Sequence, residues 1–194
     1  MTTNIILLYN EIEKEKKQMK IRKAEIKDLS DILRIYAYAR AFMKENGNPD
    51  QWGNVYPSLE MVREDIEKGI CYVCAEEKHI VGVFVFFKGE DPTYRIIREG
   101  KWHRNIPYGV LHRVASDGST KGISKLCFDF AKEHCDYLRI DTHKDNIPMQ
   151  NTLAKTGSVN AELLTLMTIP TMVPRESPMT GKPEKKILQR RILS

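Results

Sequence analysis

The chain has 194 residues, 41% of them hydrophobic and 29% charged, which is typical of one soluble globular domain and excludes a disordered or fibrous chain. The formal net charge of +5 belongs mainly to residues 175–194, where six Lys or Arg face two Glu, so we expect no nucleic-acid partner. No stretch approaches the roughly 20 apolar residues that cross a bilayer, so we expect a cytoplasmic protein with no membrane partner.

Hydrophobic periodicity predicts an α/β (α+β) chain with elements in the order βααβββαβα and a mixed central sheet flanked by helices. In chain order the predicted elements are a strand at 20–24, helices at 28–47 and 58–69, strands at 70–75, 80–88 and 106–116, a helix from 123, a strand at 137–143 and a helix at 145–157. A polar excursion at 89–105 precedes the third central strand. Ser58 is a typical N-cap, and either Asp145 or Asn146 caps the last helix.

The four cysteines could suggest a zinc site. Cys71 and Cys74 form a close pair, but Cys127 and Cys135 are too far apart to form a second matching pair. Residues three apart on a strand point to opposite faces. We therefore expect buried thiols and no metal.

A Gly-rich stretch, "ASDGSTKGIS" at 115–124, lies between a predicted strand and a predicted helix. A helix N-terminus presents free N–H groups and the positive end of the helix dipole, and glycines let a phosphate approach the backbone. Only three residues separate the two glycines, and no Gly-Lys-Ser/Thr follows, so this is not a nucleotide P-loop. The alternative to a phosphate site is a plain capped turn.

Element order and loop together resemble the GNAT superfamily of acyl-CoA-dependent N-acetyltransferases over residues 19–157. In that family a loop of the form Arg/Gln-x-x-Gly-x-Gly/Ala wraps the CoA pyrophosphate. "STKGIS" matches this form at Gly122 and departs from it at Ser119 and Ser124. "IDTHKDNIPMQNTLAKTG" is similar to the family's strand, Asn-capped helix and Gly beneath the pantetheine arm, and "NGNPDQWG" and "YGVLHRVAS" resemble one bacterial branch.

The resemblance implies transfer of an acetyl group from acetyl-CoA, as cosubstrate, to a primary amine of a small molecule or peptide. It implies no metal and leaves a homodimer open. The implied donor to the reacting carbonyl oxygen is the backbone N–H of Val114, where the strand bulges. The implied cofactor-binding residues are Val114, Ala115, Ser119, Thr120, Lys121, Gly122, Ile123, Ser124 and Asn146.

Acetyl transfer to an amine also needs a proton acceptor. His112 lies two positions before Val114 on the same face of the strand and is the candidate base, with Asp141 and His143 as rivals. The alternative for His112 is a histidine hydrogen-bonded within the sheet. Where many relatives place a Tyr acid, this chain has Leu153.

Aromatic and acidic residues suggest an acceptor site. Trp52 and Tyr108 are the candidate substrate-binding residues, and Tyr56 could also line the acceptor pocket. The alternative is that these aromatic residues belong to the core. Glu90 and Asp91 could attract a cationic amine, or they could be solvated.

Both ends of the chain depart from the resemblance. Residues 158–194 lack strand alternation and are rich in proline between 170 and 183, so we expect an irregular basic tail, and the family's final two strands are doubtful. Reading each codon one nucleotide earlier permits "GF", "CGI" and "DDGTPR", which resemble the family's closing hairpin. We therefore hypothesise a frameshift near Gly157, with a genuinely divergent tail as the alternative. Residues 1–18 are either a misassigned start or a charged, frayed helix.

These departures keep two other functions open. One is a non-catalytic acyl-CoA-binding or interaction module, which Leu153 and the tail favour. The other is an inactive frameshifted product.

Overall fold

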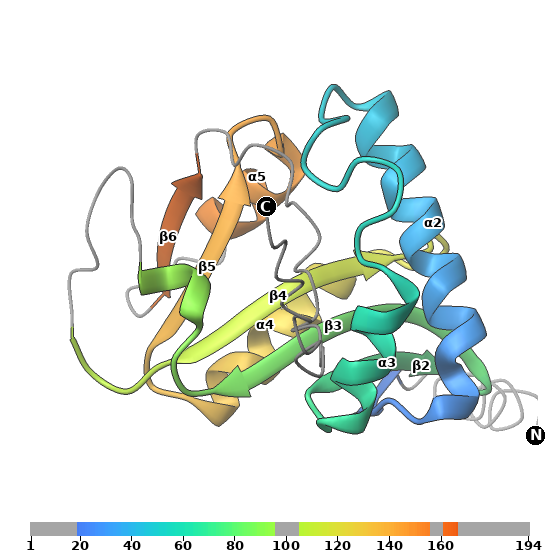
Figure 1. Ribbon diagram of the computed structural model, residues 1–194, viewed down its shortest axis with the longest axis horizontal. Coiled ribbons are helices and arrows are strands. Elements are labelled where there is room, and N and C mark those ends of the chain that lie inside the picture. The colour runs from blue at the N-terminus through green and yellow to red at the C-terminus, as the bar shows by residue number, and fades with distance from the viewer. Residues whose placement is uncertain (1–18, 96–104, 156–160, 167–194) are drawn as a thin grey trace, which may run out of the picture.

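The computed structural model describes residues 19–95, 105–155 and 161–166, the last range by its backbone alone. In chain order its elements are β1 (Met19–Lys23), η1 (Ile26–Asp28), α2 (Leu29–Glu45), α3 (Leu59–Glu67), β2 (Cys71–Glu76), β3 (His79–Lys88), η2 (Pro92–Arg95), β4 (Gly109–Ser116), α4 (Ile123–His134), β5 (Leu138–His143), α5 (Ile147–Lys155) and β6 (Ala161–Leu166) (Figure 1). The predicted order βααβββαβα is confirmed, with two short 3₁₀ helices and a sixth strand added to it. The extension at 1–18, most of the polar excursion and Gly157 lie outside the described residues.

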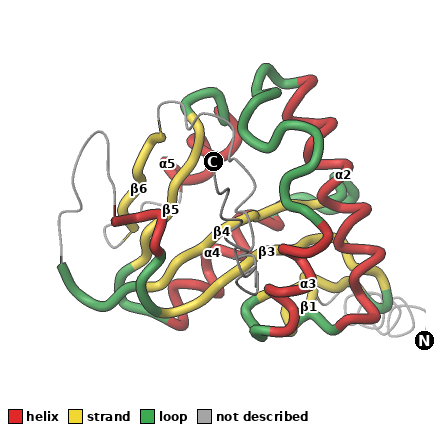
Figure 2. The backbone as a smooth tube through the Cα atoms, in the orientation of Figure 1, coloured by secondary structure: helices red, strands yellow, loops and turns green. Residues whose placement is uncertain are grey.

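The six strands form one mixed sheet in the order β1-β2-β3-β4-β5-β6 (Figure 2). The first four strands pair antiparallel with one another, whereas β5 is parallel to both β4 and β6. The switch from antiparallel to parallel occurs where α4 connects β4 to β5, because a parallel pair needs a crossover connection.

Helices cover both faces of the sheet (Figure 1), and an apolar layer lies under the helices of each face. Ile35 and Tyr36 of α2 and Val62 of α3 pack with apolar residues of β2 and β3 on one face. Phe128 of α4 packs with Phe84 and others on the opposite face. Cys71 and Cys74, three residues apart on β2, belong to these two different layers, as the strand geometry predicts.

The predicted helix caps are present. The Ser58 hydroxyl accepts a hydrogen bond from the Met61 N–H at 3.3 Å at the start of α3. At the start of α5, the Asn146 side-chain oxygen accepts one from the Met149 N–H at 3.2 Å, so Asn146 and not Asp145 is the cap. Each cap satisfies one of the free N–H groups of a first helical turn.

A β-bulge interrupts the pairing of β3 with β4. Val85 pairs with His112 and Val83 pairs with Ala115, so two residues of β4, Arg113 and Val114, stand opposite one residue of β3. Arg113 has φ = 52°, in the left-handed region that non-glycine residues rarely adopt. The bulge lies at the position predicted for it, and bulge residues are left out of the regular hydrogen-bond ladder.

In the described chain, β4 and β5 pair through their backbones at only two residue pairs. Gly109 pairs with Leu138 and Val110 pairs with Arg139, after which the register ends. The bulge of β4 therefore lies on a part of the strand whose β5 side carries no backbone ladder, and the loop that follows β4 leads directly into α4.

The sixth strand, β6, lies within the segment predicted to be irregular. It pairs with β5 in parallel along all six of its residues, from Leu138 with Ala161 to His143 with Leu166. The prediction of an irregular tail is therefore wrong for these residues, because pairing with an existing sheet edge overrides a sequence without clear alternation. Residues 158–160 and 167–194 lie outside the described chain.

Gly82 lies on β3 against the start of α4, and replacing it should destabilise the fold. A Cβ on Gly82 would lie 2.5 Å from Ile123 Cγ2 and 3.2 Å from Cys74 Cβ. We expect Gly82→Ala to lower the free energy of unfolding by about 2 kcal/mol, measured by urea denaturation, because overpacking a buried site costs about 1–3 kcal/mol.

Ile123→Ala provides the check on this cause. It removes the colliding methyl group, so the double variant should lose less stability than the sum of the two single losses. Strictly additive losses would show that Ile123 is not the source of the strain.

Candidate functional site

The loop that joins β4 to α4 is exposed, as a phosphate-binding site requires. Gly118, Ser119, Lys121 and Gly122 are exposed, and Thr120 is half-buried. Gly122 is the N-cap of α4, with φ = 85° and no side-chain cap. Since Leu126 is the first residue whose N–H bonds back to the Gly122 carbonyl, the amides of the first turn remain directed out of the helix.

Several elements fix this loop in place. The Asp117 N–H donates to the Val81 carbonyl of β3 at 3.0 Å, and the Arg34 guanidinium of α2 lies 3.5 Å from the Asp117 carboxylate. Tyr38, one turn after Arg34, packs against Gly118 so closely that a Cβ there would collide with its hydroxyl. The loop is therefore preorganised by α2 and β3.

Two carboxylates occupy donors of the loop. Asp117 Oδ1 accepts hydrogen bonds from the Ser119 N–H at 3.0 Å and from the Ser119 hydroxyl at 2.5 Å. Glu76 Oε2, at the end of β2, accepts one from the Thr120 hydroxyl at 2.9 Å. A bound phosphate must compete with these carboxylates for the two side chains, whereas the amides at the start of α4 are not involved.

A hollow of about 660 Å³ lies beside the loop. Its lining includes residues 119–123 of the loop and the Glu76 side chain. A neighbouring hollow of about 590 Å³ shares Glu76 and Ser119 and extends past Arg34. The amides of a helix N-terminus, a left-handed glycine with open space around it and an adjacent hollow together fit a diphosphate.

The buried members of the predicted cofactor set can act only through their backbone. Ala115 is 6% exposed and Ile123 is 3% exposed, and both side chains belong to the apolar layers. Val114, half-buried, contributes its side chain to the layer under α4. Their N–H groups are the atoms a ligand would use.

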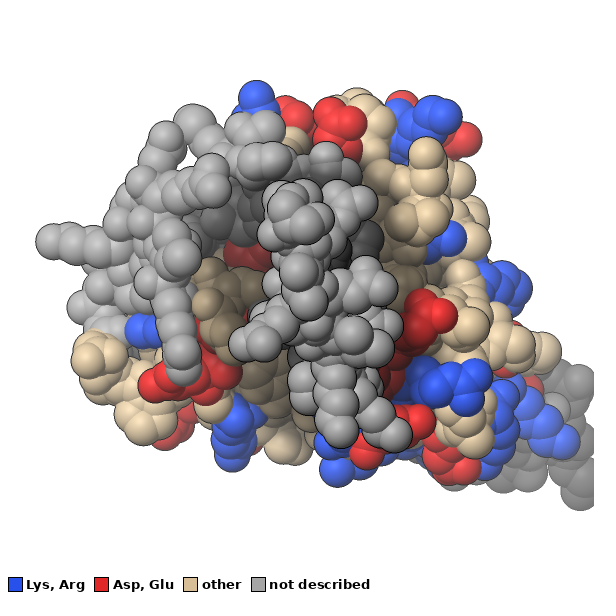
Figure 3. Space-filling view, viewed as in Figure 1, with Lys and Arg blue, Asp and Glu red and all other residues tan. Residues whose placement is uncertain are grey.

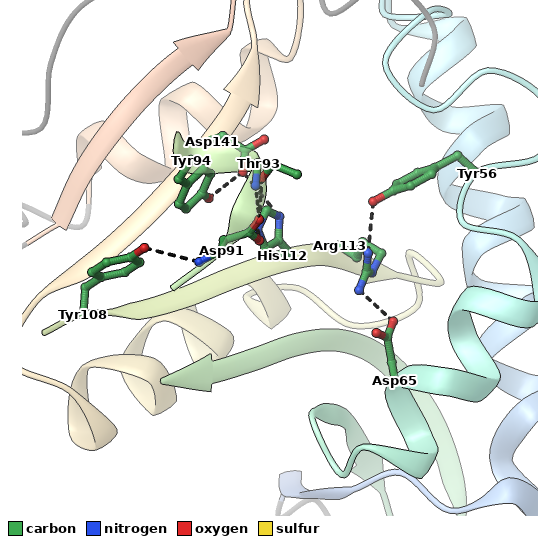
Figure 4. A network of polar contacts seen from close by, with 9 residues as sticks. All are labelled: Tyr56, Asp65, Asp91, Thr93, Tyr94, Tyr108, His112, Arg113 and Asp141. Carbon is green, nitrogen blue, oxygen red and sulfur yellow. Dashed lines mark hydrogen bonds and ion pairs between the residues drawn. The ribbon is translucent and has the colours of Figure 1, made fainter. Parts of the chain in front are cut away.

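His112 lies at the centre of a polar network on the face of the sheet that carries α2 and α3 (Figure 4). Its Nε2 is 3.0 Å from Asp91 Oδ2, and its Nδ1 is 3.3 Å from Asp141 Oδ1. The Tyr94 hydroxyl donates to the same Asp141 oxygen at 2.6 Å, and the Tyr94 ring stacks on the imidazole with centroids 5.5 Å apart. The network joins η2, β4 and β5, beyond the end of the β4–β5 ladder.

Both ring nitrogens of His112 thus face carboxylates. The prediction that His112 is the base therefore needs one addition: an amine can reach the imidazole only when one of these contacts opens. The Nδ1 contact with Asp141 is the longer of the two, and Asp91 is held in place by Thr93.

Asp91 is stabilised as a carboxylate. Burial alone would raise its pKa, but hydrogen bonds from His112 and Thr93 outweigh burial and hold the pKa well below its ordinary value. The Thr93 N–H and hydroxyl donate to Asp91 Oδ1 at 2.7 and 2.6 Å.

Asp91→Asn should therefore reduce stability in a pH-dependent way. Because the folded pKa is lowered, the stabilisation is present above the unfolded pKa and is lost as the pH falls through the folded pKa. We expect a loss of about 2 kcal/mol near pH 5.5, typical of hydrogen bonds to a charged group, that shrinks as the pH falls below about 4. Urea unfolding over this pH range measures the difference.

The matched control is Asp136→Asn, which removes an exposed carboxylate. It should leave the free energy of unfolding nearly unchanged at both pH values. A pH-independent loss in Asp91→Asn would contradict the proposed cause.

Arg113, next to His112, points away from this network and toward α3 (Figure 4). Its Nη2 lies 2.7 Å from Asp65 Oδ2, and its Nη1 donates to the Tyr56 hydroxyl at 3.1 Å. The side chains of Arg113 and Asp65 are only 13% and 10% exposed, so this is a buried ion pair. Burial alone would lower the pKa of Arg113, but the Asp65 carboxylate and the hydrogen bond to the Tyr56 hydroxyl outweigh burial and raise it.

The predicted acceptor aromatics have structural contacts. Trp52 is 8% exposed and packs edge-on against Tyr36 in the core, which favours the core role. Tyr108 lies under the Arg139 guanidinium, 3.9 Å from its ring centroid, and its hydroxyl accepts from the Asp91 N–H at 3.3 Å. Tyr56 is half-buried and contacts Trp52.

The other predicted residues are also engaged. The Asn146 amide donates to Gln51 Oε1 at 2.9 Å as well as capping α5, so both of its polar atoms are bonded to protein. His143 is buried, and its Nδ1 accepts from the Asp145 N–H at 3.3 Å. Leu153 packs against the apolar layer under α4, and Glu90 is exposed.

Several neighbours of the site were not predicted. Tyr94, Arg113 and Asp65 come from separate elements, and Arg34 and Glu76 reach the loop from α2 and β2. In the sequence, four of these residues are charged side chains within or directly after predicted elements, and such side chains are usually solvated. Nothing in the sequence distinguishes them from other surface charges.

Acidic and basic side chains are interspersed over the described surface on the face seen in Figure 3. Among the described residues, no helix is long and apolar enough to cross a membrane. In the same part of the chain, no group of three or more His, Cys, Asp or Glu side chains is placed to hold a metal ion.

Neither a protein-family model nor a curated protein matches the chain. Solved structures do match it. An acetyltransferase of the GNAT family from Streptococcus agalactiae is 30% identical, with 71% of this chain and 83% of that one covered and a TM-score of 0.62.

Two further matches are more distant in sequence. A GNAT-family acetyltransferase from Listeria monocytogenes is 18% identical, with 72% and 85% covered and a TM-score of 0.55. An aminoglycoside acetyltransferase from an uncultured soil metagenomic sample, solved with sisomicin, is 15% identical, with 78% and 95% covered and a TM-score of 0.51. At these identities the two matches support the fold alone.

Proposed function

Because the chain belongs to the GNAT family of acetyltransferases, we propose that it transfers an acetyl group from acetyl-CoA to a primary amine of a small molecule or peptide. The observation that carries the proposal is the exposed loop at the start of α4, directly after the bulge of β4. Acetyl-CoA supplies the activated acyl group as a thioester.

The loop supports binding of the CoA diphosphate. The amides of Ile123 and Ser124 and the ammonium group of Lys121 are suited to phosphate oxygens, and Gly122 lets the backbone approach them. Ser119 and Ser124 replace the longer donor and the small residue typical of the family. With Glu76 and Asp117 nearby, we expect modest affinity.

The bulge and the His112 network supply the proposed hydrogen-bond donor to the carbonyl oxygen and the proposed proton acceptor. The Val114 N–H is the proposed donor to the carbonyl oxygen on which negative charge develops. His112 is the proposed proton acceptor for the amine, held at Nε2 by Asp91 and exposed at Nδ1 when the contact with Asp141 opens. Asp91 then fixes the ring orientation, as a carboxylate commonly does for a catalytic histidine.

Two measurements test this function. Titration calorimetry with CoA should give saturable binding that weakens as salt increases, because the phosphates carry charge. Thiol release from acetyl-CoA in the presence of a panel of amines should then show turnover for at least one of them. Protein that melts cooperatively but neither binds CoA nor releases thiol would overturn the proposal.

Leu153 favours a second candidate, a non-catalytic acyl-CoA-binding module. It packs in the apolar layer where many relatives carry a hydroxyl acid. Saturable CoA binding without turnover for any amine would support the module over the enzyme.

A further inference from the structure

The structure has a strained residue directly before the proposed carbonyl-oxygen donor. Arg113 adopts φ = 52° in the middle of a strand, where glycine would carry no steric penalty. A side chain at such a position persists only when its surroundings hold it there, and such outliers concentrate at functional sites.

The surroundings that hold Arg113 come from a different element. Asp65 of α3 pairs with its Nη2 at 2.7 Å, and the Tyr56 hydroxyl, in the segment before α3, binds its Nη1 at 3.1 Å (Figure 4). Both ends of the guanidinium are therefore fixed. Since the side chain cannot swing, the backbone at the bulge is fixed relative to α3.

We propose that Arg113, anchored by Asp65 and Tyr56, is a positioning residue that aims the Val114 N–H at the thioester carbonyl. This inference rests on the proposed function, because it presumes that acetyl-CoA binds along the bulge. Arg113 itself points toward α3 and away from β5, so its role in the proposal is through the peptide group that it shares with Val114.

The test distinguishes a role of the ion pair in orienting the Val114 N–H from a role in the stability of the fold. Asp65→Leu and Arg113→Met should each destabilise the protein strongly, because each leaves one buried charge without its partner. The double variant removes both charges and should recover most of the melting temperature, since apolar replacement of a buried ion pair is often neutral. In this double variant, however, the Arg113–Asp65 ion pair no longer holds the bulge in place.

The readout compares acetyl-CoA with S-ethyl-CoA, which differ only by the carbonyl oxygen, by calorimetry without an amine. Wild-type protein should bind acetyl-CoA about threefold to tenfold more tightly, as expected for one hydrogen bond. In the double variant this ratio should fall toward one, while the affinity for S-ethyl-CoA is retained. Tyr56→Phe keeps the ion pair and should give an intermediate ratio, which keeps the test available if the double variant does not fold.

The outcomes distinguish this inference from the proposed function. Wild-type protein that binds neither ligand overturns both. Wild-type protein that binds both ligands equally, or variants that keep the wild-type ratio, overturn the positioning role alone. Loss of both affinities in parallel in folded variants shows that the ion pair only supports the fold.

Discussion

Gly122→Asp should bind CoA roughly 100-fold more weakly than the wild type, while the protein still melts cooperatively. The new carboxylate would lie at the N-cap of α4, where the diphosphate is proposed to bind. Two like charges about 4 Å apart repel by about 1–4 kcal/mol near a protein surface, which accounts for an effect of this size. Calorimetric titration with CoA at low salt measures it.

The fold should tolerate this substitution. No atom lies within 4 Å of a Cβ placed on Gly122, and Asp is among the residues that best accept a left-handed φ of 85°. A negative charge at a helix N-terminus also interacts favourably with the helix dipole. Binding is therefore expected to change much more than stability.

Gly122→Asn is the matched control, because Asn has the same shape and the same tolerance of this backbone conformation without the charge. It should bind CoA with nearly wild-type affinity. If Asn weakens binding as much as Asp does, the effect is steric. If neither variant changes the affinity, CoA does not bind at the start of α4.

His112→Gln should lower kcat/KM for acetyl transfer by about 100-fold, the usual lower range for loss of a general base. Glutamine still hydrogen-bonds one carboxylate of the pair but cannot take a proton. The affinity for CoA should stay unchanged, because His112 lies on β4 before the bulge and away from the α4 loop. Initial rates with a responsive amine measure the loss.

Asp91→Asn separates catalysis from support of the network. It loosens the same cluster but leaves the imidazole in place, so its kcat/KM should fall much less. Equal losses in both variants would assign His112 a structural role.

The secondary structure could be predicted because it depends on local spacing. The stripe that includes Ile123, Cys127 and Ala131 places one face of α4 in the core, and Ser58 and Asn146 begin their helices through hydrogen bonds within one turn. β6 could not be predicted, because it is specified by pairing with the edge of β5 and not by its own alternation.

The loop could be located from its glycines and small donors, but its electrostatics could not. Glu76 and Arg34 are distant in sequence, and only the fold brings them to residues 117–120.

His112 was proposed from its spacing of two residues from Val114, which in a regular strand puts both side chains on one face. That expectation is wrong, because the bulge breaks the alternation: Val114 packs under α4, and His112 lies on the face that carries α2 and α3. The contacts of His112 with two carboxylates, and of Arg113 with Asp65, arise from the tertiary structure and cannot be deduced from residue spacing.

The short backbone pairing between β4 and β5 affects how amino-acid substitutions can change this site during evolution. Beyond Val110 the two strands are joined by side-chain contacts, such as that of His112 with Asp141. Substitutions at these side chains would change the contacts between the two strands without breaking any backbone pairing. Point substitutions can therefore alter the polar network around His112 while the architecture stays intact.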